Sequence, residues 1–172
     1  MALVQQNFQA YLRSLRIIFA ALLISQVMVL VVLYVVRGQQ VLATTLDQQY
    51  LVRQILPIIT LALASVGFFL YRRKLMQSQA QADLKEKLNS YRVALLLRWM
   101  PLEIMSLIFS VLYFLTGRVF FLYFVLLLIP LFIVTQWPTR ANVVARLGLG
   151  THEQAIIDDP NAVVSEISQR PG

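Results

Sequence analysis

Two charged residues, Arg98 and Glu103, lie inside a long apolar stretch that runs from about residue 95 to residue 117. Charges inside a membrane are costly and commonly mark ion pathways, so Glu103 is a candidate site for coupling protons or cations. Ser106 and Ser110 follow Glu103 at intervals that place all three residues on one face of a helix. Because lipid offers no hydrogen bonds, we expect this face to turn toward other helices.

Depth in the membrane separates the two charges. A tight turn at residues 116–118 fixes one end of this helix, and about 20 residues cross the hydrocarbon, so Arg98 lies near the inner boundary. Its long side chain can reach the lipid headgroups. Glu103 lies about 7 Å deeper on the same geometry, and its side chain is too short to reach water easily. Glu103 therefore needs a partner within the protein.

Three residues in other apolar stretches are candidate partners. Arg16 and Arg72 lie at the inner ends of the first and second stretches, where either could form an ion pair with Glu103. Gln26 lies deeper in the first stretch and could meet the two serines. Two interpretations stay open, in which Glu103 either couples ion movement or locks helices together. A proton path usually needs several ionisable groups, and Glu103 is a single acid near one side of the membrane. The interpretation that Glu103 locks helices together is therefore favoured.

The composition places the chain in the membrane class. Of its 172 residues, 59% are hydrophobic and 13% are charged, whereas soluble domains have about 45–50% and about 25%. The chain has no cysteine, which excludes disulfides, thiolate metal sites and thiol catalysis. The net charge of +7 does not indicate nucleic-acid binding, because the basic residues lie at the ends of the apolar stretches.

Four apolar stretches are long enough to cross a bilayer, because about 20 helical residues span a hydrocarbon core about 30 Å thick. We predict an all-α integral membrane four-helix bundle with spans at about 17–36, 52–71, 95–117 and 119–136. A cytoplasmic amphipathic arm, residues 1–16, precedes the four-span domain at 17–137, and an ordinary frayed start of the first span is the open alternative for this arm. A cytoplasmic tail with short helices follows at 138–172.

The distribution of basic residues predicts the orientation of the spans. Arginine and lysine are concentrated in the N-terminal arm, in the 72–92 connection and at the start of the tail. By the positive-inside rule, both termini lie in the cytoplasm (N-in/C-in), and we expect a bacterial inner membrane. Residues 84, 88, 91 and 95 form an apolar helical stripe, which predicts a cytoplasmic helical extension between spans 2 and 3.

The start of the tail resembles a known group of proteins. Pro138 and Thr139 are followed, after seven residues, by Leu147 and Leu149 in the segment PTRANVVARLGLGTHEQ. This pattern is similar to the cytoplasmic tails of small uncharacterised four-span bacterial membrane proteins. The resemblance implies the same four-span topology, and it implies no activity, substrate or catalytic residue.

The residue types that enzymes use are sparse. The single histidine, His152, stands beside Glu153, where a solvated helix start is expected rather than a metal ligand. The sequence has no phosphate-binding glycine loop and no serine in a recognisable catalytic motif. We therefore expect no enzymatic activity, no cofactor, and no catalytic, cofactor-binding or metal-binding residue.

Two functions from different classes fit these features. The favoured hypothesis is a non-enzymatic accessory or scaffold component that acts through helix contacts in the membrane. The alternative is a small oligomeric transporter or channel that uses Glu103 for proton or cation coupling. The expected partners are anionic lipids of the inner leaflet and either another membrane protein or a second copy of the chain, and not nucleic acid.

Overall fold

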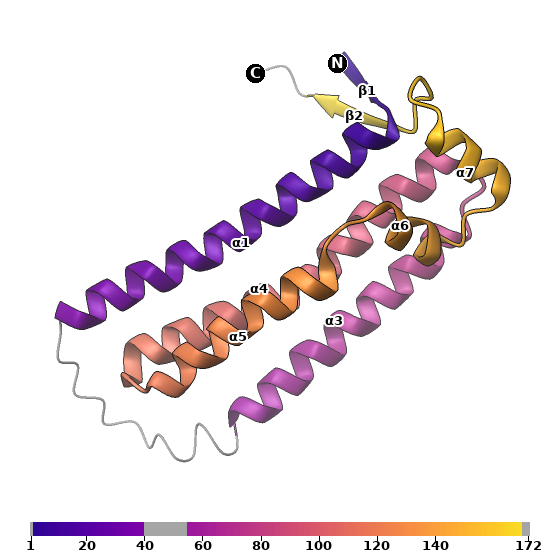
Figure 1. The fold of residues 1–172 in the computed structure, drawn as a ribbon. Coiled ribbons are helices and arrows are strands. Elements are labelled where there is room, and N and C mark those ends of the chain that lie inside the picture. The colour runs from indigo at the N-terminus through magenta and orange to yellow at the C-terminus, as the bar shows by residue number, and fades with distance from the viewer. Residues whose placement is uncertain (1, 40–54, 170–172) are drawn as a thin grey trace. The chain divides into compact units, whose positions relative to one another are not determined.

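The computed structural model describes residues 2–39 and 55–169, which are almost entirely helical (Figure 1). The described part has six helices and two strands. The long helices are α1 (Phe8–Gln39), α3 (Leu56–Gln79), α4 (Leu84–Thr116) and α5 (Val119–Gln136). The short elements are α6 (Arg140–Leu147), α7 (Thr151–Asp158), β1 (Ala2–Gln6) and β2 (Ser165–Gln169).

The four long helices correspond to the four predicted spans. Each is long enough and apolar enough to cross a membrane. The prediction of four apolar candidate spans in a helical chain is therefore confirmed. Residues 52–54 of the second predicted span lie outside the described residues.

The two ends of the chain differ from the prediction, because they form a small sheet. β1 and β2 are antiparallel, with Ala2 opposite Gln169 and Gln6 opposite Ser165. The predicted amphipathic arm therefore contains a strand, and its helical part begins only at Phe8. Asn7 caps this helix, since its side-chain oxygen accepts a hydrogen bond from the Ala10 backbone N–H at 2.9 Å.

The chain forms two compact units. The terminal unit contains the described residues of Met1–Phe19, Leu70–Leu97 and Pro138–Gly172. The apolar unit contains those of Ala20–Phe69 and Arg98–Trp137. Three helices, α1, α3 and α4, contribute residues to both units.

The first part of α4 lies at the centre of the terminal unit. Leu84, Leu88, Tyr91 and Leu95 are all buried, as their helical spacing predicts. Tyr11 of α1 is also buried, and its hydroxyl donates a hydrogen bond to the Leu88 carbonyl at 2.8 Å. This bond satisfies a polar group inside an apolar core and joins α1 to α4.

A polar contact also holds the tail helix α7 against α4 in the terminal unit. Gly148, with a φ of 62°, ends α6 in the left-handed conformation that glycine adopts easily. The chain then enters α7, where the Glu153 carboxylate accepts a hydrogen bond from the Gly150 backbone N–H at 2.9 Å. The other carboxylate oxygen of Glu153 accepts one from the Lys87 ammonium at 2.6 Å. Glu153 thereby fixes both the start and the docking of α7.

This ion pair predicts a pH-dependent contribution to stability. The hydrogen bond from Lys87 lowers the pKa of the Glu153 carboxyl below its ordinary value of 4.5. A carboxyl whose pKa is lower in the folded state stabilises that state above its unfolded pKa, and this stabilisation is lost as the pH falls through the folded pKa. We therefore predict that Lys87→Met lowers the free energy of unfolding by a few tenths to about 1 kcal/mol near neutral pH, and that the difference vanishes in acid.

Thermal unfolding in detergent, from neutral pH down to about pH 3, measures this difference. Arg73→Met is the matched control, because it removes an exposed positive charge from the same unit. If Lys87→Met were as much less stable than the wild-type protein at about pH 3 as at neutral pH, the loss of stability would not come from the ion pair with Glu153.

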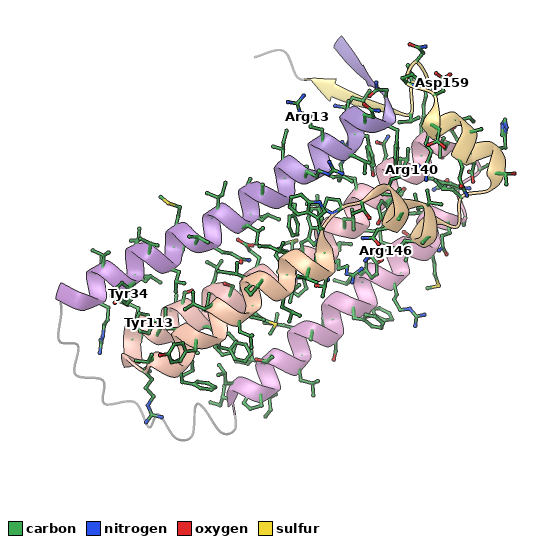
Figure 2. The ribbon with its side chains drawn as sticks, in the orientation of Figure 1. Arg13, Tyr34, Tyr113, Arg140, Arg146 and Asp159 are labelled. Carbon is green, nitrogen blue, oxygen red and sulfur yellow. The ribbon has the colours of Figure 1, made fainter. Side chains whose placement is uncertain are left out.

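All four long helices contribute to the core of the apolar unit. The buried members of this core come from α1, α4 and α5, and Leu56 and Leu63 of α3 pack against them. These members are Leu30, Met105, Phe109, Tyr113, Phe121 and Val125. Tyr34 of α1 stacks on Tyr113 of α4, with ring centroids 6.2 Å apart (Figure 2).

The tight turn predicted at 116–118 is confirmed. Only Gly117 and Arg118 separate α4 from α5. Gly117 has a φ of 67°, a conformation that favours glycine. Arg37 of α1 donates a hydrogen bond to the Phe114 carbonyl at 3.0 Å, and its guanidinium lies where a side chain at position 117 would go. The turn therefore needs glycine for its backbone angle, whereas the flexible side chain of Arg37 could move away from a larger residue.

The apolar helices leave most of their side chains uncovered. Only 11–33% of the residues in the most apolar window of each candidate span are buried. Exposed residues include Ile24, Met28, Phe68, Leu127 and Val134. Soluble monomers rarely expose apolar surface on this scale, whereas a lipid environment solvates it.

Candidate functional site

Glu103 lies in the apolar unit, where two residues of α1 bind its carboxylate. The Ser25 hydroxyl lies 2.8 Å from Glu103 Oε1, and the Gln26 side-chain amide donates a hydrogen bond to Glu103 Oε2. Gln26 is only 3% exposed, whereas Glu103 is half-buried. The two oxygens of the acid are thus each in reach of a neutral donor, and the contacts link α4 to α1.

The Ser25 hydroxyl has a choice of acceptors. Besides Glu103, it lies 2.9 Å from the carbonyl of Leu22, one turn earlier in α1. A hydroxyl has a single proton and can donate to one acceptor at a time. Among the described residues, the amide of Gln26 donates to Glu103 and to no competing acceptor, so it provides the steadier of the two bonds.

The path of α4 near Glu103 is shaped by Pro101. A proline inside a helix has no N–H to donate to the carbonyl four residues earlier, and it commonly kinks the helix. The ring of Pro101 lies directly against Gly67 of α3, because a Cβ built on Gly67 would overlap ring atoms of Pro101. Two helices therefore approach closely at the turn of α4 that carries Glu103.

Ser106 and Ser110 continue the polar stripe of α4 into the core of the apolar unit. Both are buried, and the Ser110 hydroxyl donates a hydrogen bond to the Ser106 carbonyl at 2.8 Å. The Ser106 hydroxyl is buried and has no hydrogen-bond partner among the described residues. Gln26, predicted to meet one of these serines, donates instead to Glu103. The polar residues of the stripe thus face protein, and only its first member is bonded to α1.

The two arginines predicted as ion-pair partners of Glu103 belong to the terminal unit. Arg16 lies on α1, and its Nε donates a hydrogen bond to the Pro138 carbonyl at 3.3 Å. Arg72 lies on α3. An ion pair of either residue with Glu103 stays a prediction, since Glu103 lies in the other unit.

Sequence reasoning missed Ser25 as a partner of Glu103. The signal was present, because Ser25 and Gln26 are adjacent polar residues in a stretch that is otherwise apolar for several turns. Polar side chains inside a span generally face other helices. Which helix they face depends on helix rotation, and the sequence of one chain does not supply that angle.

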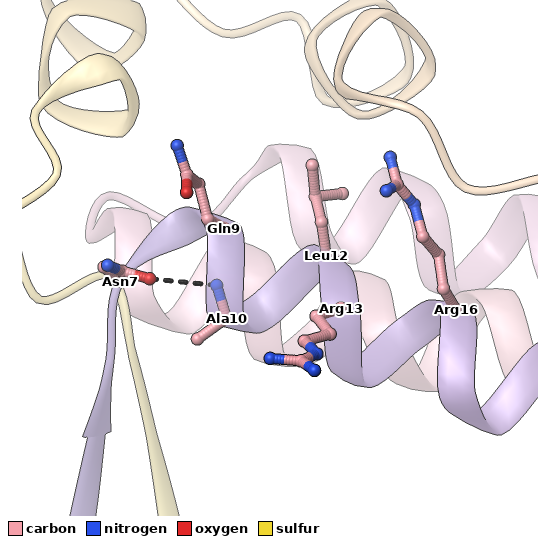
Figure 3. Close-up of a pocket in the computed structure, with 6 residues that line it drawn as sticks. All are labelled: Asn7, Gln9, Ala10, Leu12, Arg13 and Arg16. Carbon is pink, nitrogen blue, oxygen red and sulfur yellow. Dashed lines mark hydrogen bonds between the residues drawn. The ribbon is translucent and has the colours of Figure 1, made fainter.

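A second polar region lies at the start of α1, in the terminal unit (Figure 3). A groove of about 620 Å³ there is lined by Asn7, Gln9, Ala10, Leu12, Arg13 and Arg16. The side chains of Arg13 and Arg16 leave the helix in opposite directions (Figure 3). The two guanidinium groups therefore do not converge on one point, as the joint binding of a phosphate or carboxylate would need.

The side chains of these sites offer hydrogen bonds and charge. Among the residues that the structure describes, no group of three or more histidine, cysteine, aspartate or glutamate side chains could hold a metal ion. Comparison with known proteins finds no matching family model, no matching curated protein and no matching solved structure.

Proposed function

We propose that this chain is a non-enzymatic integral protein of the bacterial inner membrane that serves as an accessory or scaffold component. It crosses the membrane four times, keeps both termini in the cytoplasm, and acts through the outward faces of its helices. The observation that carries this proposal is the binding of Glu103 by two neutral donors of α1, Ser25 and Gln26. An acid used in this way joins helices, and it leaves the exposed apolar faces for lipid and partner helices.

The strand pairing supports the placement of both termini on one side of the membrane. β1 and β2 are hydrogen-bonded to each other, so the two ends of the chain share one compartment. An even number of crossings, such as four, is compatible with that pairing. The concentration of arginine and lysine in the arm, the 72–92 connection and the tail supports the cytoplasm as that compartment.

Single cysteines test this topology cleanly, because the natural chain has none. Asp159→Cys places a thiol in the tail and Arg118→Cys places one in the turn between α4 and α5, and both positions are exposed. In intact spheroplasts, a membrane-impermeant maleimide should label Arg118→Cys and should label Asp159→Cys only after lysis. Labelling of Asp159→Cys alone in intact spheroplasts would show the opposite orientation. Equal labelling of Asp159→Cys and Arg118→Cys would contradict the four-span topology.

A small transporter or channel is the second candidate, and one observation favours it. The hydroxyl of Ser106 is buried without a partner among the described residues, and it follows Glu103 on the same face of α4. A buried polar atom of this kind normally binds protein or ordered water. Water that reached Ser106 would extend to Glu103 and give a start to a proton path.

Glu103→Gln separates the two functions. In a transporter, proteoliposomes that contain this variant should lose proton- or cation-coupled flux while the fold stays intact. In a scaffold, the wild-type protein has no such flux, and a pull-down in mild detergent recovers a membrane protein in a complex larger than the chain alone. Flux that depends on Glu103 would contradict the scaffold proposal and favour a transporter. A wild-type protein that stays monomeric and recovers no partner would also contradict the scaffold proposal.

A further inference from the structure

A groove of about 330 Å³ lies between α4 and α5 in the apolar unit, and its lining changes from apolar to polar. Its apolar lining residues are Leu102, Leu128, Leu131 and Phe132. Its polar lining residues are Arg98, near the middle of α4, and Thr135 and Gln136, at the end of α5. None of the lining residues is acidic. The groove therefore has the polarity of an amphipathic ligand that carries negative charge at one end.

A short series of hydrogen bonds fixes the orientation of the Gln136 amide. The Thr135 hydroxyl donates its proton to the Leu131 carbonyl at 2.7 Å. The Thr135 oxygen can then act only as an acceptor, and it takes a hydrogen bond from the Gln136 Nε2 at 3.2 Å. This leaves the Gln136 Oε1, which is buried and has no hydrogen-bond partner among the described residues. A buried acceptor without a donor is costly and indicates a missing partner.

We propose that this groove binds one anionic glycerophospholipid whose headgroup carries a hydroxyl, such as phosphatidylglycerol. The Arg98 guanidinium attracts the phosphate, because cation–phosphate hydrogen bonds are among the stronger ones in proteins. A headgroup hydroxyl supplies the donor that Gln136 lacks. One acyl chain lies along the leucine and phenylalanine wall. The inference rests on the proposed membrane location. It identifies a lipid ligand for this groove, to which the scaffold proposal assigns no partner.

The shape and charge of the groove favour a lipid chain over a protein helix, which is about 10 Å across. An acyl chain is narrower and can follow the space between two helices. The polar end also selects the headgroup, because a choline headgroup has no donor to offer Gln136 and no net negative charge to pair with Arg98.

Native mass spectrometry of the purified full chain in detergent tests this site with three lipids that have the same acyl chains. Phosphatidylglycerol has a net negative charge and a headgroup hydroxyl, phosphatidylmethanol has the net charge without a hydroxyl, and phosphatidylcholine has neither. The wild-type protein should bind them in that order of affinity. Equal binding of all three would overturn the proposal, because nonselective lipid contact would then explain it.

Two variants, with one matched control, assign the effect to the groove. Arg98→Gln should weaken binding of both anionic lipids by about tenfold or more, as expected for loss of a hydrogen bond to a charged group. Arg118→Gln makes the same change in the turn between α4 and α5, outside the groove, and should leave binding unchanged. Gln136→Leu should make phosphatidylglycerol bind like phosphatidylmethanol. Equal losses in the two arginine variants, or a headgroup preference that survives Gln136→Leu, would overturn the site.

These measurements fail or succeed independently of the proposed function. Lipid binding in detergent needs no partner protein and no particular orientation in a membrane. If flux depended on Glu103, the scaffold proposal would fail, but the measured lipid binding would still be valid. If the lipid test failed, the pull-down would still test the scaffold proposal. If Arg98→Gln does not fold, the headgroup order of the wild-type protein and the response of Gln136→Leu still decide the question.

Discussion

Gly67→Ala should destabilise the protein by about 2–3 kcal/mol, in the range that overpacking of a tight site costs. The reason is the position of Gly67 on α3, where an added methyl group would overlap the ring of Pro101 on α4. The ring is covalently tied to its own backbone at two points, so it cannot rotate away as a flexible side chain would. The two helices must therefore separate, and the turn of α4 that positions Glu103 must move with them.

The predicted loss of stability in Gly67→Ala is opposite in sign to the usual effect of this substitution. Replacing glycine by alanine inside a helix ordinarily stabilises it by about 0.5–1 kcal/mol. Gly38→Ala in α1 is the matched control, because nothing lies within 4 Å of a Cβ built there, and it should be neutral or stabilising. Unfolding of both variants in detergent by heat or denaturant measures the difference. A Gly67→Ala protein as stable as Gly38→Ala would show that α3 and α4 do not approach closely.

A second substitution identifies the cause of the Gly67→Ala defect. Pro101→Ala removes the ring atoms that meet the new methyl group, although the Cβ of residue 101 stays 2.9 Å from it. The double variant Gly67→Ala/Pro101→Ala should therefore recover part of the stability lost by Gly67→Ala. Residues in contact show a coupling energy above a few tenths of a kcal/mol. If the stability changes of the two single variants simply added in the double variant, Gly67 and Pro101 would not be in contact.

Gln26→Leu should lower the free energy of unfolding by about 1–3 kcal/mol, because it removes the steadier donor from the carboxylate of Glu103. The leucine fills a similar volume, so the loss reports the polar contact rather than a cavity. An acid left with the shared hydroxyl of Ser25 is incompletely satisfied in surroundings that offer little water. This loss exceeds the average of about 0.6 kcal/mol for hydrogen bonds between membrane helices, because the remaining group is ionisable.

A double-mutant cycle in detergent checks this contact. Glu103→Leu and Gln26→Leu should each destabilise the protein, and the double variant should lose much less than the sum, because it leaves no polar group unpaired. Ser106→Ala is the control, since the hydroxyl that it removes has no partner among the described residues. That variant should be close to neutral. Additive losses in the cycle would mean that Gln26 and Glu103 act separately.

The sequence predicted the parts of this fold that follow from local pattern. The four apolar helices follow from length and composition, and the turn at Gly117 follows from the lack of residues between two spans. The buried stripe of Leu84, Leu88, Tyr91 and Leu95 follows from helical periodicity. Each of these features is set by residues that are close together in the chain.

The features that the sequence did not reveal are contacts between distant residues. Whether Glu103 meets Gln26 or a basic residue depends on the rotation and depth of two helices, which hydropathy leaves undetermined. The contact of Gly67 with Pro101 depends on the crossing point of α3 and α4. The pairing of β1 with β2 has no local signal, because each strand is five residues long and its partner lies at the other end of the chain.

That pairing also sets an order on biosynthesis. The residues of β1 are made before the six helices and those of β2 after them, so the sheet closes only once these helices have been made. Closing so large a loop has a high entropic cost, which is met only when the helices have already brought the ends near each other. A chain that stops short of Ser165 would carry β1 with an open edge, the kind of surface on which unfinished proteins aggregate. A paired sheet therefore indicates that all six helices have been made.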